Sequence, residues 1–183
     1  MDREKAFLKV QENVGSQNLI KHMLATEAIM RALANRIGED EALWGLTGLL
    51  HDIDMEICDG DMQSHSKIGA QMIHDMDVGV EVVNAVLRHN EAHGYEVQTR
   101  LDRALFCSDA LTGLITTTAL VRPDKKISSV ELKSIKKKYK EKGFAAGVSR
   151  EQIETCRNLG LELDEFIELG LKAMQAISDE LGL

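Results

Sequence analysis

Proline is almost absent from this sequence: Pro123 is the only one in 183 residues. A proline inside a helix removes a backbone hydrogen bond and clashes with the preceding turn, so its scarcity permits long uninterrupted helices. Helix formers such as alanine, leucine, glutamate, lysine and methionine are plentiful. We therefore predict an all-α fold without strands. The length suits one domain, residues 1–183, that buries on the order of 70% of its unfolded surface.

Cysteine is rare as well, and long apolar runs are missing. The three cysteines, Cys58, Cys107 and Cys156, lie far apart and lack the CxxC spacing of thiolate metal sites and redox pairs. The first five residues are largely charged, and no stretch reaches the ~18 consecutive apolar residues of a membrane span. These features predict reduced thiols in a cytoplasmic protein that does not associate with a membrane.

The net charge of −8 argues against a general nucleic-acid binder. The charge is unevenly distributed, because residues 122–142 contain nine lysines or arginines and three acidic residues, a balance of +6, which leaves −14 for the rest. We favour a solvated helix face for this basic segment. The alternative is a surface that attracts a phosphorylated substrate.

Glycines, the proline and capping residues divide the chain into helices. The first is expected before Gly15, and the others over residues 18–37, 39–52, 64–76, 78–89 or 78–93, 100–122 and 163–181. An acidic loop is expected over residues 54–63. Two capping boxes, Ser128 with Glu131 and Ser149 with Gln152, mark further helix starts.

Several histidines are predicted to face the core. At about 100° per residue, His22 lies on the apolar stripe of its helix. The pair His51-Asp52 closes the apolar run of residues 42–50, where a buried polar pair needs a compensating partner. His65 lies on an apolar stripe, whereas His74 lies about 180° from it and is expected to be exposed.

The same test applies to the later helices. His89 shares a face with valines and an alanine, and His93 would lie close to that face if the helix continued. Asp109 is the only charged side chain from residue 104 to residue 121, and an ionised carboxylate there is costly unless it is paired or binds a metal. One inward histidine is more often a hydrogen-bonded core residue than a ligand. Several inward histidines and two aspartates together favour an open catalytic site for Fe, Mn or Zn.

The ordered set His22, His51-Asp52 and Asp109 resembles the signature of the HD superfamily. Residues 64–70 and 87–91 resemble the extra histidine segments of dinuclear members, and residues 105–111 resemble the family's aspartate-bearing helix. The resemblance covers about residues 16–123 and leaves residues 124–183 as a C-terminal helical extension. The whole chain looks similar to small proteins described as predicted HD hydrolases. The resemblance implies an HD-type helical bundle with additional C-terminal helices.

The resemblance also implies a site and an activity. The first metal ion would be held by His22, His51, Asp52 and Asp109, and a second by Asp52, His65 and His89, so that one or two divalent ions are expected. His51 and Asp52 would be catalytic, because they would hold the metal that activates a hydroxide to attack phosphorus. Lys67, Arg88 and His93 are candidates for substrate binding.

The implied function is a metal-dependent phosphohydrolase acting on a small phosphorylated substrate, a nucleotide or related phosphate ester. Two alternatives remain open: an HD-type mixed-valence di-iron oxygenase, and a non-catalytic sensor that binds nucleotide or metal. The sequence leaves the oligomeric state undetermined. It departs from the frequent His-Asp-Ile-Gly form at Asp54, and from the paired histidines of some dinuclear members at Asn90.

Overall fold

The computed structural model describes residues 1–183 and contains only helices and connecting turns, which confirms the all-α prediction. The helices are α1 (Arg3–Asn13), α2 (Gln17–Ile37), α3 (Glu41–Leu50), α4 (Lys67–Asp75), α5 (Val80–His89), α6 (Arg100–Leu120), α7 (Leu132–Lys140), α8 (Arg150–Glu154), α9 (Leu163–Ala176) and α10 (Ser178–Leu181). Short 3₁₀ turns η1 (Glu91–His93), η2 (Ile127–Ser129) and η3 (Thr155–Leu159) link some of them.

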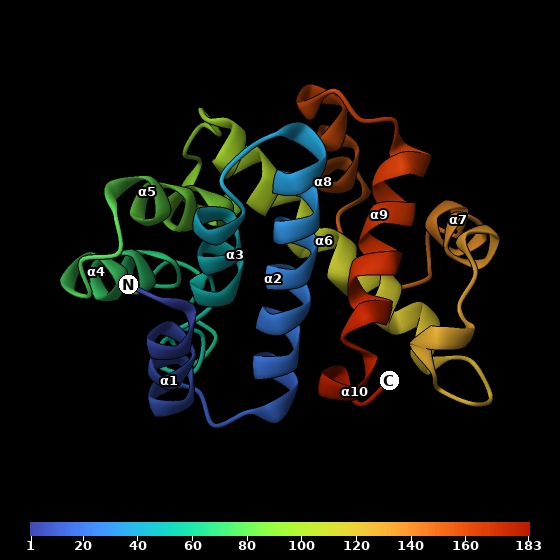
Figure 1. The fold of residues 1–183 in the computed structure, drawn as a ribbon, viewed down its shortest axis with the longest axis horizontal. Coiled ribbons are helices and arrows are strands. Elements are labelled where there is room, and N and C mark those ends of the chain that lie inside the picture. Colours follow the sequence, from blue (N-terminus) through green and yellow to red (C-terminus); the bar gives the residue numbers. More distant parts are fainter.

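The long helix α2 forms the centre of the molecule, with α3 on one side and α9 on the other (Figure 1). The other long helix, α6, contacts α2, α5 and α8. One connected cluster of buried apolar side chains extends from α1 to α10, and its largest fully buried members include Met23, Ile29, Leu50, Leu111 and Phe166. Because α2 and α6 both contribute to this cluster, they form a rigid base for side chains placed between them.

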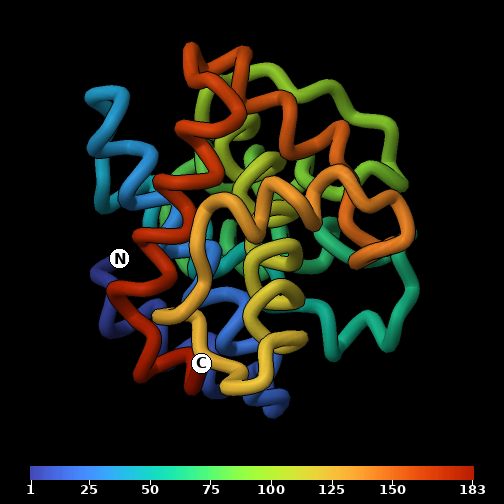
Figure 2. Tube along the Cα trace, turned by 90° about the vertical axis from the view of Figure 1, so that its right-hand side faces the viewer, coloured from blue at the N-terminus to red at the C-terminus, as the bar shows by residue number.

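Residues after α6 cover one side of this base. Figure 2 shows the stretch around residues 125–150 lying across the face turned toward the viewer. Among the helices after α6, α7 and α8 pack against α6, and α9 packs against α2. The C-terminal extension therefore contacts the same two helices that provide His22 and Asp109. None of the helices combines the length and apolar character needed to cross a bilayer.

Several predicted helix boundaries were wrong. α4 begins at Lys67 and not at residue 64, because Ser66 adopts a left-handed conformation with φ 67° and its side chain makes no capping bond. Ser128 belongs to η2 and caps no helix. The last helix is interrupted at Ile177. Ser149 does cap α8 through the backbone N–H of Gln152, yet the Gln152 side chain does not complete the expected capping box.

Candidate metal centre

Six polar side chains from different parts of the chain meet at one place between α2, α3, α5 and α6. His22 lies within α2, His89 ends α5 and Asp109 lies within α6. The others follow α3, which places them in turns: His51, Asp52 and His65. His51 is fully buried, whereas the side chains of His22 and Asp109 are 27% and 30% exposed, so the cluster opens to solvent on their side.

The six side chains form two groups. In the first, His22 Nε2 lies 3.2 Å from His51 Nε2 and 3.0 Å from Asp109 Oδ1. In the second, His65 Nε2 lies 3.2 Å from His89 Nε2. The ligand atoms of His22, His51 and Asp109 are close enough to share one cation, and so are those of His51, Asp52 and His89.

Asp52 lies between the two groups and presents one oxygen to each. Its Oδ2 lies 3.5 Å from His22 Nε2 and 3.3 Å from His51 Nε2. Its Oδ1 lies 3.5 Å from both His65 Nε2 and His89 Nε2. Each oxygen of Asp52 is therefore near the Nε2 atoms of one of the two groups.

The outer nitrogen of each histidine is engaged by a group that determines the tautomer. His51 Nδ1 lies 2.8 Å from the carbonyl oxygen of Gly48, and His89 Nδ1 lies 2.6 Å from that of Val86. A carbonyl oxygen can only accept, so both Nδ1 atoms carry hydrogen. The Thr112 hydroxyl donates to a backbone carbonyl and therefore accepts from His22 Nδ1 at 3.0 Å.

This orientation places the Nε2 atoms of each group 3.2 Å from one another. Two unprotonated nitrogens at that distance repel, whereas a proton or a metal ion between them turns the contact into an attractive one. Imidazole nitrogens and carboxylates together suit Fe, Mn or Zn. The donor set therefore fits one or two divalent ions.

The charges of the group also shift its proton affinities. Burial by itself lowers the pKa of His51, but the carboxylates of Asp52 and Asp109 outweigh it and raise that pKa well above the usual value. Burial raises the pKa of Asp52, but His51 and its neighbours outweigh it and hold that pKa well below the usual range. Burial also raises the pKa of Asp109, but the imidazoles of His22 and His51 outweigh burial and lower that pKa. Both aspartates are thus anionic acceptors at neutral pH.

Asp54 orients His65, a role that our sequence analysis missed. Its Oδ1 accepts a hydrogen bond from His65 Nδ1 at 2.9 Å, and its Oδ2 accepts from the backbone N–H groups of Ser66 and Gly69 at 2.8 and 2.7 Å. Asp54 is fully buried. A carboxylate behind a ligating histidine fixes its ring and raises its basicity. The sequence signal for this role was the aspartate at position 54, where the frequent His-Asp-Ile-Gly form has glycine.

Cys58 lies beside Asp54 and is hydrogen-bonded to it. Its thiol donates to Asp54 Oδ2 at 3.5 Å. Burial, together with the Asp54 charge, raises the pKa of the Cys58 thiol to about 11. The thiol is therefore protonated at neutral pH, as its hydrogen bond to Asp54 requires. The oxygens of Asp54 are already occupied by hydrogen bonds.

The structure does not bring the predicted substrate-binding residues into the cluster. Arg88 donates to Asp102 at 2.9 Å and to Gln98 at 2.8 Å. Lys67 is exposed at the start of α4. His93 lies behind the cluster, where its Nε2 donates to the carbonyl oxygen of His65 at 2.7 Å. The His74 side chain is 72% exposed, in agreement with its predicted direction.

A cleft of about 380 Å³ opens over the cluster. Its lining includes Asp52, His65, His89 and Asp109, and also the following side chains that sequence patterns did not mark as a site: Met55, Met62, Asn90, Glu91, Ala92 and Gln152. No lysine or arginine is among the lining residues. A second cavity, of about 460 Å³, borders His22 from the side of Lys21.

Comparison with known proteins gives one family and a set of relatives. Residues 19–114 match the model of the HD domain. The chain is 29% identical over 148 residues to ribonuclease Y of Sulfurovum sp. (strain NBC37-1) and 30% identical over 148 residues to that of Bacillus subtilis (strain 168). Each alignment covers 79% of this chain and 28% of the relative. The chain thus spans little more than a quarter of the length of these relatives. No solved structure matches it.

Proposed function

Because the chain belongs to the HD domain family, we propose that it is a metal-dependent phosphohydrolase acting on a nucleotide or related phosphate ester. The observation that carries the proposal is the convergence of four imidazole Nε2 atoms on the carboxylate oxygens of Asp52 and Asp109, a donor set that suits a divalent cation. The relatives named ribonuclease Y support a phosphate ester of nucleotide type as substrate.

The proposed ligands follow the two groups. His22, His51, Asp52 and Asp109 would hold one ion, and Asp52, His65 and His89 the other, with Fe, Mn or Zn as the metals. When bound, such ions lower the pKa of water and neutralise charge on a phosphoryl group.

The side chains of the protein contribute orientation and access. Hydrogen bonds from the Nδ1 atoms hold the four imidazole rings with Nε2 toward Asp52. Buried His51 closes the inner end of the site against bulk water, whereas the exposed edges of His22 and Asp109 admit a substrate. The cleft lining contains no serine, threonine or cysteine that would act as a nucleophile.

Metal content and turnover, measured together, test the proposal. Asp52→Ala and Asp109→Ala should lose bound metal and hydrolysis of p-nitrophenyl phosphate together, because each removes an anionic ligand. His74→Ala is the matched control and should leave both unchanged, since its side chain points into solvent. Full metal content in either aspartate variant would contradict the ligand assignment.

The same preparation tests the reaction class and the number of ions. Hydrolysis should proceed without O₂, and turnover that requires O₂ would contradict a phosphohydrolase. Saturated wild-type protein should hold two ions per chain. The double variant His65→Ala, His89→Ala should fall toward one ion, because the group of His22, His51 and Asp109 remains complete.

A further inference from the structure

The geometry points to Gln152 as the residue that recognises the base of a nucleotide substrate, an inference that rests on the proposed function. Gln152 belongs to α8, outside the residues that the HD domain model covers. Its side chain nevertheless lines the same cleft as Asp52 and Asp109. The C-terminal extension would thereby add specificity to a metal site built from the rest of the chain.

The start of α8 is held firmly in place. The guanidinium group of Arg150 donates to backbone carbonyl oxygens of the preceding segment, at distances of 2.5 to 3.4 Å: those of Lys138, Tyr139, Phe144, Ala145 and Val148. Ser149 caps the helix at 3.2 Å, and Ile153 is fully buried on the side of the core. This anchoring, together with the packing of α8 against α6, the helix that carries Asp109, fixes the backbone of Gln152 relative to the cleft.

The side-chain amide of Gln152 is free to bind a ligand. It makes no hydrogen bond within the protein, and in particular it does not return to Ser149 as the capping box would require. The other amide in the cleft lining, Asn90, is fully engaged: its NH₂ group donates to the carbonyl oxygens of Met62 and His65, and its oxygen accepts from Ala92 N–H. Gln152 is therefore the only unoccupied amide of the cleft.

The chemistry of the lining indicates which part of a substrate Gln152 meets. An amide is neutral and offers a donor and an acceptor side by side, a pattern that matches the hydrogen-bonding edge of a nucleobase. The phosphate belongs with the proposed metal ions, because no cationic side chain lines the cleft. Met55 and Met62 supply adaptable apolar surface in the same cleft, which suits the face of a base.

Kinetics with two kinds of probe test this assignment on the metal-loaded full chain. Nucleoside monophosphates carry a base, whereas p-nitrophenyl phosphate does not. Gln152→Ala should raise KM for the preferred nucleotide about five- to tenfold, the effect of one lost hydrogen bond, with kcat little changed. KM for p-nitrophenyl phosphate and the metal content should stay at wild-type values. Gln152→Glu, which replaces a donor by an acceptor, should change the order of preference among the four bases.

Gln71→Ala is the matched control, because this amide is exposed on α4 and bonded to Asp75. Equal changes for nucleotide and base-free probe, or no change for either, would overturn the inference. If the wild type hydrolysed neither probe, the proposed hydrolase function would fail, and the inference about Gln152 would still have to be tested by binding. Calorimetric binding of nucleoside monophosphates would then decide: weaker binding to Gln152→Ala supports base recognition, and equal or absent binding to both proteins overturns it.

Discussion

At the scale of single residues, Asp54 shows how a buried carboxylate supports a ligand without touching the proposed metal. Its oxygens accept hydrogen bonds from His65 Nδ1 and from two backbone N–H groups. Asp54→Asn keeps an acceptor but loses the charge that makes His65 more basic. We expect the affinity for the second ion to fall by about 10- to 100-fold while the first ion stays bound. Metal titration checks this.

The control for that experiment is Asp75→Asn, since this carboxylate is 65% exposed and contacts only α4 side chains. It should bind both ions like the wild type. Equal affinity for the second ion in Asp54→Asn and Asp75→Asn would show that the Asp54 charge has no role in metal binding.

Asp102 is a second buried carboxylate, and its role is structural. Burial raises its pKa, but hydrogen bonds from Thr99, Gln98 and Arg88 outweigh burial and lower the pKa below the ordinary value of 3.8. The folded state therefore favours the ionised form. Its stabilisation is fully present above the unfolded-state pKa and is lost as pH falls through the lower, folded-state pKa. Acid weakens this contribution.

Asp102→Asn should lower the free energy of unfolding at pH 7 by about 1–3 kcal/mol, because Arg88 loses its charged partner. The difference from wild type should shrink as the pH falls below about 4, because the unfolded state then takes up a proton at Asp102 more readily than the folded state does. Urea unfolding at pH 7 and pH 3 measures both values. A difference that stays constant between these pH values would contradict the assigned cause.

At the scale of elements, the crossing of α2 and α3 depends on a glycine. A Cβ atom at Gly48 would lie 2.9 Å from backbone atoms of Glu27 and Thr26. Backbone atoms cannot move aside as a flexible side chain can. Gly48→Ala should therefore destabilise the protein by about 1–3 kcal/mol, despite the higher helix propensity of alanine. A displacement of the α3 backbone at Gly48 would also disturb the proposed metal centre, because the carbonyl oxygen of Gly48 accepts the hydrogen bond that orients His51.

Gly143→Ala is the comparison for Gly48→Ala. A Cβ at Gly143 has no neighbour within 4 Å, so the substitution should change stability by no more than about 0.5 kcal/mol. Thermal unfolding of the two variants separates them. Similar melting temperatures would mean that α2 and α3 can move apart at little cost.

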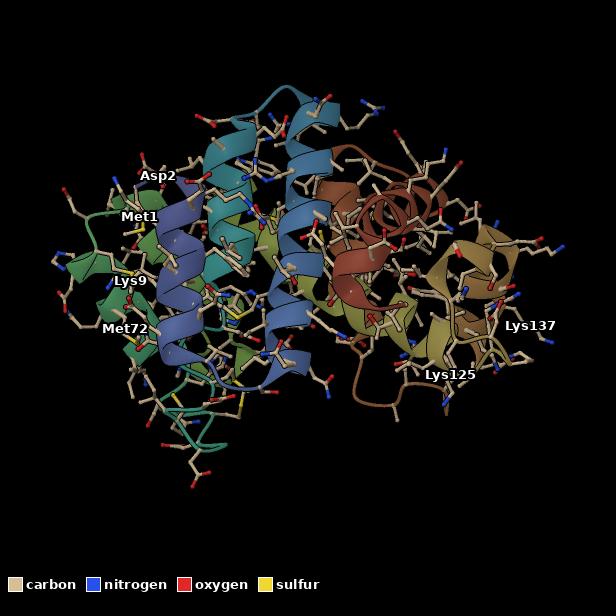
Figure 3. All side chains as sticks on the ribbon, turned by 60° about the horizontal axis from the view of Figure 1, so that its bottom comes forward. Met1, Asp2, Lys9, Met72, Lys125 and Lys137 are labelled. Carbon is tan, nitrogen blue, oxygen red and sulfur yellow. The ribbon has the colours of Figure 1, made fainter.

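At the scale of the whole molecule, the basic segment of residues 122–142 lies at the periphery. Figure 3 shows Lys125 and Lys137 at one outer edge, opposite the edge where Met1, Asp2 and Lys9 lie. Several of its lysines pair with carboxylates: Lys133 with Glu131 at 2.6 Å, and Lys136 with Asp164 at 2.5 Å. These pairs reduce the field that a distant substrate would experience.

We therefore expect these lysines to have little effect on substrate capture. Changing Lys133, Lys137 and Lys140 to Gln makes the net charge more negative by three, yet kcat/KM should stay unchanged, and stability should shift by no more than about 0.5 kcal/mol per site. Rate measurements over a range of salt concentrations check this. A lower kcat/KM with a weaker salt dependence than wild type would indicate steering by the segment.

The sequence by itself determined the class of fold and the direction of the polar side chains. Helical periodicity is a short-range property, so apolar spacing correctly placed His89 inside and His74 outside. His51 and His65 are buried as predicted, although they lie in turns and not in helices. The boundaries were less accurate wherever a local conformation such as that of Ser66 began or ended a helix. The HD domain was recognisable because His22, His51-Asp52 and Asp109 occur in the order of the family's signature, and the family model matches residues 19–114.

Only the tertiary structure decided which of these side chains meet. The two histidine groups, the position of Asp52 between them and the contact of Arg88 with Asp102 all join residues from separate elements. Gln152 lies 100 residues after Asp52, and no local pattern linked it to the cleft. Such proximity arises from packing of whole helices around a common core, and the spacing of residues within one helix carries no information about it.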